Sequence, residues 1–324
     1  MSMRPANHDS PHPWAIVIFA SRESLAVLIT TIKAAQIAAR GVADINVVVN
    51  GKRELAKAVT KQLCDPEFAI AETPIKVWEI TVGDKANAWN QYLHQIWSGE
   101  RIVFFIDGYV RLNADSVKLL GEAVANQEDV LGGTGVPHIE PSTITPHAHL
   151  APGSGFHGNF CCLTATAIEK IRLQHISLPV GLYRVDSLMG AMLCAGFDFA
   201  SNNWVEGRIF VHPFASWQTD PKHWWRFSDI RAQIKRIFRQ SRGVFENLAA
   251  RDHLVVRKQP PELMPATANE LILEWVQRCP EEANKVIRYN PLARRALADI
   301  KRSAGHTKVV EHIAPTLMGT TKIP

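Results

Sequence analysis

The sequence predicts an α/β fold with a mostly parallel central sheet, followed by a helical C-terminal extension. Apolar runs alternate with helical stretches as far as residue 126, at the spacing of βαβ units. The first run, WAIVIFA at residues 14–20, shows no polar alternation, which is typical of a strand buried on both faces. From residue 227 onward the pattern is predominantly helical.

Four strand and helix units are expected in succession. The predicted strands are residues 14–20, 45–49, 75–82 and 102–106, and the helices after them are 24–40, a helix from about 53, 85–97 and 114–126. A Pro-, Gly- and His-rich stretch at 132–158 lacks periodicity, and such segments are usually functional loops. Later predicted elements are a helix at 184–195, a strand at 209–212 and helices at 227–251, 269–279 and 293–303. The predicted organisation is a flexible N-terminus at 1–13, an α/β domain at 14–222 and a helical extension at 223–324.

Composition and charge restrict the class of protein. The 324 residues are 46% hydrophobic and 21% charged, as in an ordinary globular protein with a substantial core. The net charge of +5 fits an anionic small substrate or an anionic membrane surface better than a nucleic acid. The five cysteines form no CxxC pair, which favours a reducing setting. Since no apolar run reaches the ~18 residues of a spanning helix and residues 1–13 lack a signal core, we expect a cytoplasmic protein.

An aspartate directly follows the fourth predicted strand. The segment IVFFIDGY ends at Asp107 and its turn, and ligands of parallel sheets gather at the carboxyl ends of the strands. A hard divalent cation could bridge this carboxylate to a diphosphate, although an aspartate there could also only cap the turn. Asn50 and Asp84 follow two other strands, so the three side chains should converge on one crevice.

The segment GDKANAWNQYL at 83–93 begins the third predicted helix. It places Lys85 and two asparagines where exposed helix amides can bind a phosphate or a base. The alternative is that these residues simply form a solvated first turn of the helix. The absence of a phosphate-loop pattern favours that alternative when the segment is considered alone.

Taken together, these segments resemble the inverting glycosyltransferase family 2, whose catalytic domain has the GT-A nucleotide-sugar-binding fold. The resemblance spans roughly residues 14–217 and rests, in order, on AIVIFASRES, INVVVNGK, DKANAWN, FFIDGYVRLNADSVKLL, GNFCCLTATAIEKI and RVDSLMGAMLCAGF. It implies a GT-A catalytic domain at 14–222 and a metal-dependent transfer of sugar from a nucleotide-sugar donor, with UDP as the expected nucleotide. The implied acceptor is a hydroxyl of a glycan or of a lipid-linked saccharide.

The resemblance also implies roles for individual residues. Asp107 would be the first residue of a DxD motif that contacts Mn²⁺ or Mg²⁺ and the donor's diphosphate, together with Gly108 and Tyr109. Asp186 would be the general base that takes a proton from the acceptor hydroxyl, or it could simply cap its helix. His212 would be a further metal ligand, or else a satisfied buried histidine.

Further residues are expected at the donor. Lys85 and Asn90 match the family's Gly-Lys-x-x-A-x-N stretch, which helps to form the nucleotide and sugar pocket. Ser21 and Glu23 follow the first strand and Asn50 follows the second, so these residues complete the expected donor-binding set.

Three positions depart from the family pattern. Tyr109 replaces the second acidic residue of DxD, and Asn50 stands where relatives usually have an aspartate that reads the nucleoside. An amide can still hydrogen-bond a base edge, but it offers donor and acceptor faces without charge. Val185 precedes Asp186 where many relatives have two acids. The two positions that match the family's functional acids are still occupied by aspartates, Asp107 and Asp186, so the sequence still favours catalysis.

Two stretches beyond these motifs have more than one interpretation. Residues 223–243 form a basic amphipathic pattern with tryptophans at one end, which could lie on an anionic membrane or pack on the catalytic domain. The localisation that follows is cytoplasmic, with possible peripheral contact at the inner face of the membrane. The histidines of the long loop match no zinc pattern, so an acceptor-side loop is preferred. They are His138, His147, His149 and His157.

Two other functions compete with glycosyl transfer. The first alternative is a non-catalytic nucleotide-sugar-binding or scaffold protein that retains the fold, which turnover dependent on Asp186 would exclude. The second is a nucleotidyltransferase, which should carry a Gly-rich basic loop after its first strand. The loop at residues 21–24 is SRES and contains no glycine.

Overall fold

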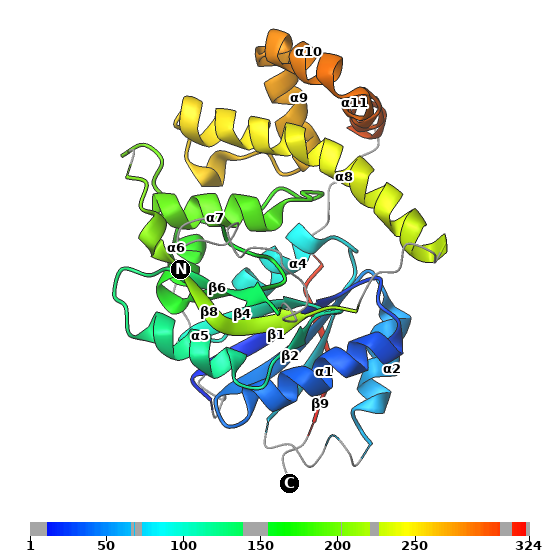
Figure 1. The fold of residues 1–324 in the computed structure, drawn as a ribbon, viewed down its shortest axis with the longest axis vertical. Helices are drawn as coiled ribbons and strands as arrows, with labels where there is room; N and C mark the ends of the chain where they lie inside the picture. The colour runs from blue at the N-terminus through cyan, green and yellow to red at the C-terminus, as the bar shows by residue number, and fades with distance from the viewer. Residues whose placement is uncertain are drawn as a thin grey trace.

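The computed structural model places a nine-stranded sheet between two layers of helices, with a further group of helices packed above one layer (Figure 1). The structure describes residues 12–65, 68, 73–138, 155–201, 203–220, 227–304 and 313–321. The predicted flexible N-terminus lies outside this range except for residues 12 and 13, and so do His147 and His149 of the predicted loop.

The first half of the chain follows the predicted order of strands and helices. Its elements are β1 (Trp14–Ala20), α1 (Leu25–Ala39), β2 (Ala43–Asn50), α2 (Arg53–Gln62), β3 (Ile75–Ile80), α4 (Lys85–Gln91), the π-helix η1 (Tyr92–Ile96), β4 (Ile102–Asp107), β5 (Arg111–Leu112), α5 (Ser116–Ala125) and β6 (Gly132–Pro137). The second half adds β7 (Phe160–Thr164), α6 (Ala165–Leu173), α7 (Val185–Ala195), the 3₁₀ turn η3 (Glu206–Arg208), β8 (Ile209–Gln218), α8 (Phe227–Arg251), the π-helix η4 (Asp252–Val256), the 3₁₀ turn η5 (Pro261–Leu263), α9 (Ala268–Arg278), α10 (Pro280–Tyr289), α11 (Pro291–Ala304) and β9 (Thr316–Thr320).

The sheet has the strand order β5-β8-β6-β7-β4-β1-β2-β3-β9. The four strands β1 to β4 run parallel, and β6 and β8 run in the same direction as they do. Only β5, β7 and β9 of the described strands run the opposite way. The expected α/β fold with a mostly parallel sheet and a helical C-terminal extension is confirmed.

Strand β1 lies at the centre of the sheet and is buried along its whole length. Val17 and Phe19 point into one apolar core, which α4, α6 and α7 close, while Ile16 and Ile18 point into the other, under α1, α2 and α5. This division explains why the strand shows no polar alternation. A third core, around Phe245 and Trp275, holds the helices α8 to α11 together.

Strand β6 corrects the expectation of a structureless loop at 132–158. Its sequence, GGTGVP, has little strand propensity, because glycine has no side chain to pack against neighbouring strands. The glycines are required by close contacts: a Cβ on Gly135 would lie 2.4 Å from the Phe160 ring, and one on Gly132 would lie 2.7 Å from the Cys162 carbonyl. Packing against β7 and β8 therefore overrides the local preference. Residues 139–154 of the predicted loop lie outside the described range.

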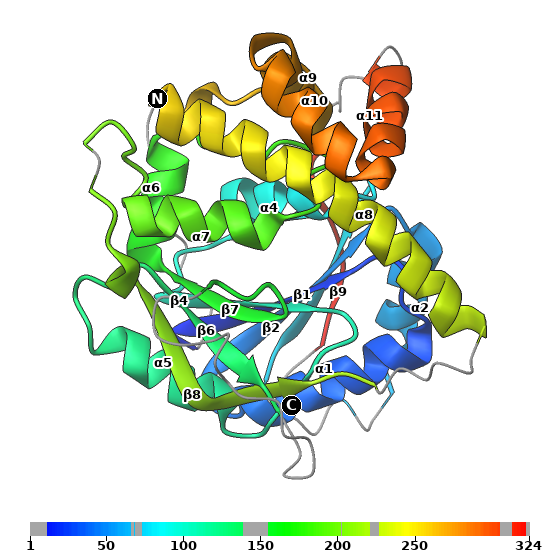
Figure 2. The ribbon, with the colours of Figure 1, turned by 45° about the horizontal axis from the view of Figure 1, so that its top comes forward.

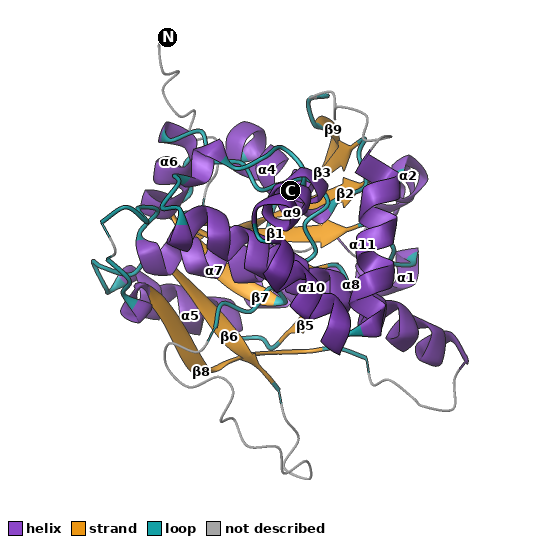
Figure 3. Cartoon of the chain, turned by 90° about the horizontal axis from the view of Figure 1, so that it is seen from above, coloured by secondary structure: helices purple, strands orange, loops and turns teal. Residues whose placement is uncertain are grey.

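The C-terminal extension also differs from its sequence pattern. Helix α10 was missed, although Pro280 begins it and acidic residues occupy its first turn. The end of the described chain returns to the sheet, where β9 pairs antiparallel with β3 and becomes the outermost strand on that side of the sheet (Figure 3). No helix in the described part of the chain has the length and apolarity that a membrane crossing requires.

Candidate active site

The carboxyl ends of β1, β2, β3 and β4 lie level with one another at one edge of the sheet. Phe19 is the register partner of Asp107, and Asn50 is the partner of Ile80. The loops after these strands therefore start at the same edge. Gly51 and Gly83 allow two of the loops to touch, because a Cβ on Gly51 would lie 2.4 Å from the Gly83 Cα.

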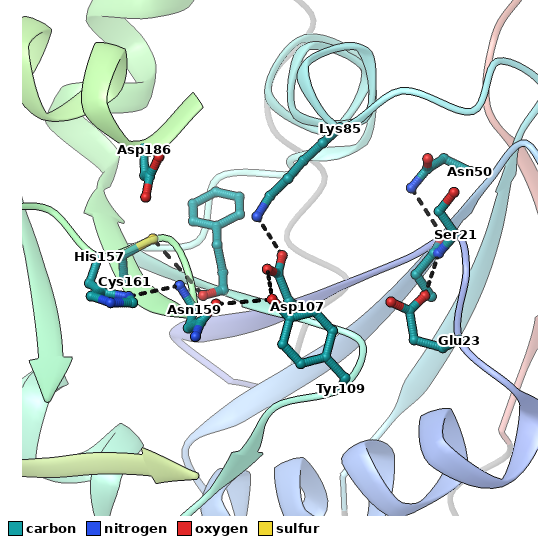
Figure 4. A network of polar contacts seen from close by, with 12 residues as sticks. Ser21, Glu23, Asn50, Lys85, Asp107, Tyr109, His157, Asn159, Cys161 and Asp186 are labelled. Carbon is teal, nitrogen blue, oxygen red and sulfur yellow. Dashed lines mark hydrogen bonds and ion pairs between the residues drawn. The ribbon is translucent and has the colours of Figure 1, made fainter. Parts of the chain in front are cut away.

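Asp107 ends β4 in a network with two neighbours (Figure 4). The Lys85 ammonium donates to its Oδ1 at 2.5 Å, and the Tyr109 hydroxyl donates to its Oδ2 at 3.0 Å. Burial is the largest single influence on the pKa of Lys85 and lowers it, but the charge and hydrogen bond of Asp107, together with the charge of Asp186, raise that pKa above its ordinary value. Lys85 is therefore a permanent cation at the carboxyl edge of the sheet.

The first turn of α4 fixes the position of Lys85. The Asp84 side chain caps this helix by accepting from the Asn87 amide at 2.9 Å, and Lys85 is the first helical residue. The interpretation of this segment as a solvated first turn does not hold, since Asn87 and Trp89 are buried and Trp89 stacks on Phe105 of β4 at 4.0 Å between ring centroids. The stacking holds α4 on the sheet and so holds Lys85 beside Asp107.

Asp186 enters the site from the first turn of α7, a helix of the same layer as α4. It does not cap the helix: Arg184 is the N-cap residue, and the Asp186 carboxylate accepts only a local bond from the Ser187 amide at 3.0 Å. Gly158 packs against it, because a Cβ there would lie 3.3 Å from the carboxylate. Asp186 and Asp107 both raise the pKa of Lys85, so both carboxylates lie near the same ammonium group.

His157 is a neighbour that the sequence placed only in an acceptor-side loop. Burial lowers its pKa despite the nearby Asp186 and Asp107, so the ring is neutral near pH 7. Its Nδ1 accepts from the Asn159 amide at 3.4 Å, and its ring lies 5.0 Å from that of Trp217. Asn159 was missed altogether: its Oδ1 lies 3.3 Å from the Tyr109 hydroxyl, and its only sequence signal is its place immediately before β7.

Several predicted donor-binding residues use polar atoms to hold the chain itself. The Asn50 Nδ2 donates to the Ala20 carbonyl at 3.0 Å, and the Glu23 carboxylate accepts from the Ser21 amide at 2.6 Å. Both polar atoms of Asn90 bond to the backbone of residue 178, at 2.8 Å each. These side chains shape the loops around the site.

Gly108 has a similar structural use. Its amide donates to the Phe19 carbonyl at 2.8 Å, and a Cβ would lie 3.1 Å from Ala20. The turn after Asp107 therefore packs directly against the end of β1.

The structure does not bring His212 to Asp107. His212 lies on β8, and the strands β6 and β7 separate β8 from β4. Its Nδ1 accepts from the amides of Phe214 and Ala215, at 3.2 and 2.9 Å. No group of three metal-ligating side chains occurs within the described residues. The metal role of His212 thus stays a prediction from the resemblance alone.

Figure 4 shows the site residues in two groups with Lys85 and Asp107 between them. Ser21, Glu23 and Asn50 lie on one side, at the ends of β1 and β2. Asp186 lies on the other side, with His157, Asn159 and Cys161 below it.

Comparison with known proteins agrees with this architecture. The chain is similar to the mannosyltransferase PcManGT from Pyrobaculum calidifontis, solved in complex with GDP-Man and Mn²⁺, with a TM-score of 0.55 and 14% identity over 93% of this chain and 79% of that chain. The chain has a glycosyltransferase fold. It also matches S. aureus TarS 1–349, with a TM-score of 0.47 and 11% identity, and the same protein with UDP, at 0.48 and 9%; each match covers 92% of this chain and 93% of that one. No family model matches the chain, and no curated protein sequence matches it significantly.

Proposed function

We propose that this protein is an inverting glycosyltransferase that moves a sugar from a nucleoside diphosphate donor to an acceptor hydroxyl, with UDP as the expected nucleotide. The observation that carries the proposal is the pair Asp107 and Asp186, which come from β4 and α7 and both lie near the Lys85 ammonium (Figure 4). A transfer of this kind needs positive charge at the leaving diphosphate and a base at the incoming hydroxyl. The fold supplies both at one edge of the sheet.

The two carboxylates would divide the work. The acceptor oxygen attacks the anomeric carbon and forms the new glycosidic bond, its proton passes to Asp186, and the bond to the phosphate oxygen breaks with its electrons leaving on the diphosphate. Asp186 suits this role because, among the described residues, the hydrogen bond to its carboxylate comes from the Ser187 amide next to it in the chain. A single displacement inverts the anomeric centre.

Asp107 and Lys85 would form the diphosphate end of the site. A small divalent cation is often held by one or two carboxylates together with substrate phosphates, so Asp107 fits as a single protein ligand for Mn²⁺ or Mg²⁺. Such a cation would supply charge to the departing diphosphate. Lys85 places a second positive charge at the same edge without any metal.

The nucleoside end would lie against the loops after β1 and β2. Asn50 is 3% exposed and its Nδ2 is bonded to the Ala20 carbonyl, so it is the Oδ1 that would accept from a base. An imide or amide N–H, as in uracil or guanine, is the donor that such an oxygen recognises. The arrangement supports a nucleoside diphosphate donor and keeps UDP and GDP as the two nucleotides to compare first.

Binding and turnover would test the proposal. Calorimetric titration with UDP, GDP and other nucleoside diphosphates, each with Mn²⁺, Mg²⁺ or chelator, should give one preferred nucleotide. Asp107→Ala should weaken that binding by about tenfold or more, which corresponds to about 1.4 kcal/mol. Asp186→Asn should keep the binding but lose donor hydrolysis and transfer across a panel of nucleotide sugars.

Asp129→Asn is the matched control, since this exposed residue precedes β6 at the opposite edge of the sheet. If Asp186→Asn turns over the donor as fast as this control, Asp186 is not the base. A folded protein that binds nucleotide but shows turnover with no sugar would favour the non-catalytic alternative. Failure to bind any nucleotide would refute the donor site itself.

We further propose that the first half of α8 contacts an anionic membrane surface, which would suit a lipid-linked acceptor. Ile230, Ile234 and Ile237 repeat at helical spacing and are each 43% to 50% exposed. Arg231 and Arg236 are exposed on the same segment. Figures 1 and 2 show this half of α8 projecting beyond α9 to α11. An apolar stripe flanked by arginines matches a negatively charged lipid surface.

Vesicle sedimentation would test the membrane proposal. Binding should be strong with vesicles containing phosphatidylserine, weak with phosphatidylcholine alone, and reduced by salt. Ile234→Ser combined with Ile237→Ser should lower the bound fraction, whereas Val256→Ser, at an exposed apolar residue beyond α8, should not. Equal binding by both variants, or none by the wild type, would contradict the proposal.

A further inference from the structure

The loop at residues 178–184 leads directly into α7 and therefore into Asp186. We call it the approach loop. It lies between two layers that belong to different parts of the chain, α4 below it and the C-terminal helices above it. Each layer binds its backbone, so the loop is held from both sides.

Helix α4 holds the first part of the approach loop. Asn90 bonds to both the amide and the carbonyl of Leu178, at 2.8 Å each. Asp84, which also caps α4, accepts from the Gly181 amide through its second oxygen at 3.1 Å. Asp84 and Asn90, which precede and follow Lys85 on the same helix, thus connect the donor end of the site to the approach loop.

Helix α8 holds the last part of the approach loop through a buried carboxylate. Glu246 is 1% exposed, and its Oε2 accepts from the amides of Tyr183 and Arg184 at 3.0 and 3.1 Å. Arg184 is the N-cap of α7 and makes no side-chain capping bond. In a capping box, a glutamate in the helix's own first turn would bond this amide. Here Ser187 occupies that position, and Glu246 from another helix supplies the carboxylate.

Arg242 completes the same arrangement one helical turn earlier. Its Nε pairs with Glu246 at 3.0 Å, and its guanidinium also donates to the Gly181 carbonyl at 3.2 Å and to Asn269 of α9 at 2.9 Å. A planar guanidinium can make these bonds together because its donors point in fixed directions. One arginine therefore joins α8, α9 and the approach loop.

Two backbone features bring the C-terminal helices close enough to make these contacts. Gly243 lets the Arg184 side chain lie across α8, since a Cβ there would lie 2.5 Å from the Arg184 Nε. Val180 exchanges hydrogen bonds with the residues that begin α9: its amide donates to the Ala266 carbonyl and its carbonyl accepts from the Ala268 amide, each at 2.9 Å.

We propose that Glu246 and Arg242 are positioning residues for the proposed transfer reaction, and that the C-terminal helices are thereby part of the catalytic apparatus. They touch neither the donor edge nor Asp186; they fix the backbone from which Asp186 projects. The inference rests on the proposed role of Asp186 as the base. A base displaced by about 1 Å can lose about 100-fold in rate, so loss of this support should slow turnover.

Glu246→Gln is the variant that tests the proposal. Its side chain keeps the size of the glutamate, but an uncharged amide cannot offer one oxygen to the two amides and a second oxygen to the arginine, as the carboxylate does. We expect the nucleoside diphosphate dissociation constant and the donor KM to stay within about twofold of wild type, while kcat falls by about 10- to 100-fold. In hydrogen exchange, peptides covering residues 181–188 should exchange faster than in the wild type.

Asp252→Asn is the matched control. Asp252 is a second buried acid of the C-terminal helices, paired with Arg257 and Arg278 just beyond α8, and it does not contact the approach loop. This variant should lose thermal stability as Glu246→Gln does, but keep kcat and the exchange of residues 181–188 near wild type. A merely structural role for Glu246 would make the two variants alike, and that result would overturn the proposal.

Failure of the proposed function would look different. If Asp186→Asn retains turnover, Asp186 is not the base, whatever Glu246→Gln does. If Asp186→Asn is inactive while Glu246→Gln has wild-type kcat and wild-type exchange, the base assignment stands and the positioning role is refuted. The exchange measurement needs no substrate. Unchanged exchange of residues 181–188 in Glu246→Gln therefore refutes the positioning role of Glu246 even where turnover is too slow to measure.

Discussion

At the scale of single residues, the pairing of Lys85 with Asp107 decides the electrostatics of the site. The ammonium keeps its proton because the Asp107 and Asp186 carboxylates together outweigh the effect of burial on its pKa. The Tyr109 hydroxyl holds the second carboxylate oxygen, so a tyrosine in place of the expected acid orients Asp107 rather than adding charge. Asp107 is therefore paired with one cation, Lys85, whereas a second acid at position 109 would place two anions beside the same lysine.

Replacing Lys85 tests this view of the site. Lys85→Met should weaken nucleoside diphosphate binding by about 10- to 100-fold, because a hydrogen bond to a charged group contributes about 1.5–3 kcal/mol. Calorimetric titration in chelator measures the effect without metal. Lys57→Met, which removes an exposed lysine paired with Glu54 on α2, should leave binding unchanged. Equal affinity of Lys85→Met and wild type would contradict a role for Lys85 at the diphosphate.

At the scale of elements, strand β6 shows how packing selects a structure that local propensity disfavours. Three of its six residues are glycine, and neighbouring strands fill the space that side chains would take. The register between β6 and β8 shifts at Gly135, as in a β-bulge. Because Asn159 immediately precedes β7 and β6 pairs with β7, the glycines of β6 help to position the strand that follows Asn159.

Gly135→Ala should therefore destabilise the fold. Its Cβ would meet both the Phe160 ring and the Ala215 carbonyl within 2.5 Å, and overpacking of this kind costs about 1–3 kcal/mol. Urea denaturation measures the loss as a lower midpoint at unchanged slope. Gly207→Ala is the control, since the nearest atom to its Cβ would lie 4.0 Å away. A midpoint for Gly135→Ala equal to that of the control would contradict this prediction, because it would show that Phe160 and Ala215 can move away from the added methyl group at little cost in free energy.

At the scale of the whole molecule, the C-terminal third is joined to the α/β domain in two places. The helices α8 and α9 bind the approach loop on one side of the site, and β9 pairs with β3 at the far edge of the sheet. The residues that join these segments are far apart in the sequence: Glu246 and Tyr183, for example, are separated by more than 60 positions. Such contacts form only once the chain has folded, so they leave no periodic pattern.

His253 makes the stability of this third sensitive to pH. Its Nδ1 accepts from the Arg257 guanidinium at 3.1 Å and its Nε2 lies 3.3 Å from the Pro260 carbonyl, an arrangement that needs a neutral ring. Burial, together with Arg257, lowers the pKa of His253 below 6.5. Unfolded histidine takes up a proton near pH 6.5, so the unfolded state binds more protons just below that pH and the free energy of unfolding falls as the pH drops.

Urea denaturation at pH 7.5 and pH 5.5 checks this expectation. Wild type should lose free energy of unfolding between the two pH values, and His253→Gln should lose less, by about 1.4 kcal/mol for each unit by which the pKa is lowered. His175→Gln, at an exposed histidine, is the control. The burial of Glu246 raises its pKa and acts in the opposite sense, but it is common to all three proteins and cancels in their differences. Identical losses in the two variants would refute the role of His253.

Local sequence patterns were sufficient to predict the α/β class, the order of the first four strands and helices, and the place of Asp107 and Lys85 at the carboxyl ends of the parallel strands. These follow from signals that are local in the chain: apolar runs, helical periodicity and capping residues such as Asp84. The limits of α8, at 227 and 251, were also predicted correctly from its periodicity.

Which polar side chains bond to the chain itself depends on the three-dimensional packing and could not be predicted. Asn90 was expected at the donor, yet both of its polar atoms bind Leu178, and Asp186 was a possible helix cap until Arg184 was found in that position. Glu246 carries no sequence signal, because its role depends on two amides that reach it only when α8 packs over the approach loop. Hydrogen-bond partners distant in sequence depend on how the layers pack, and a linear pattern does not contain that information.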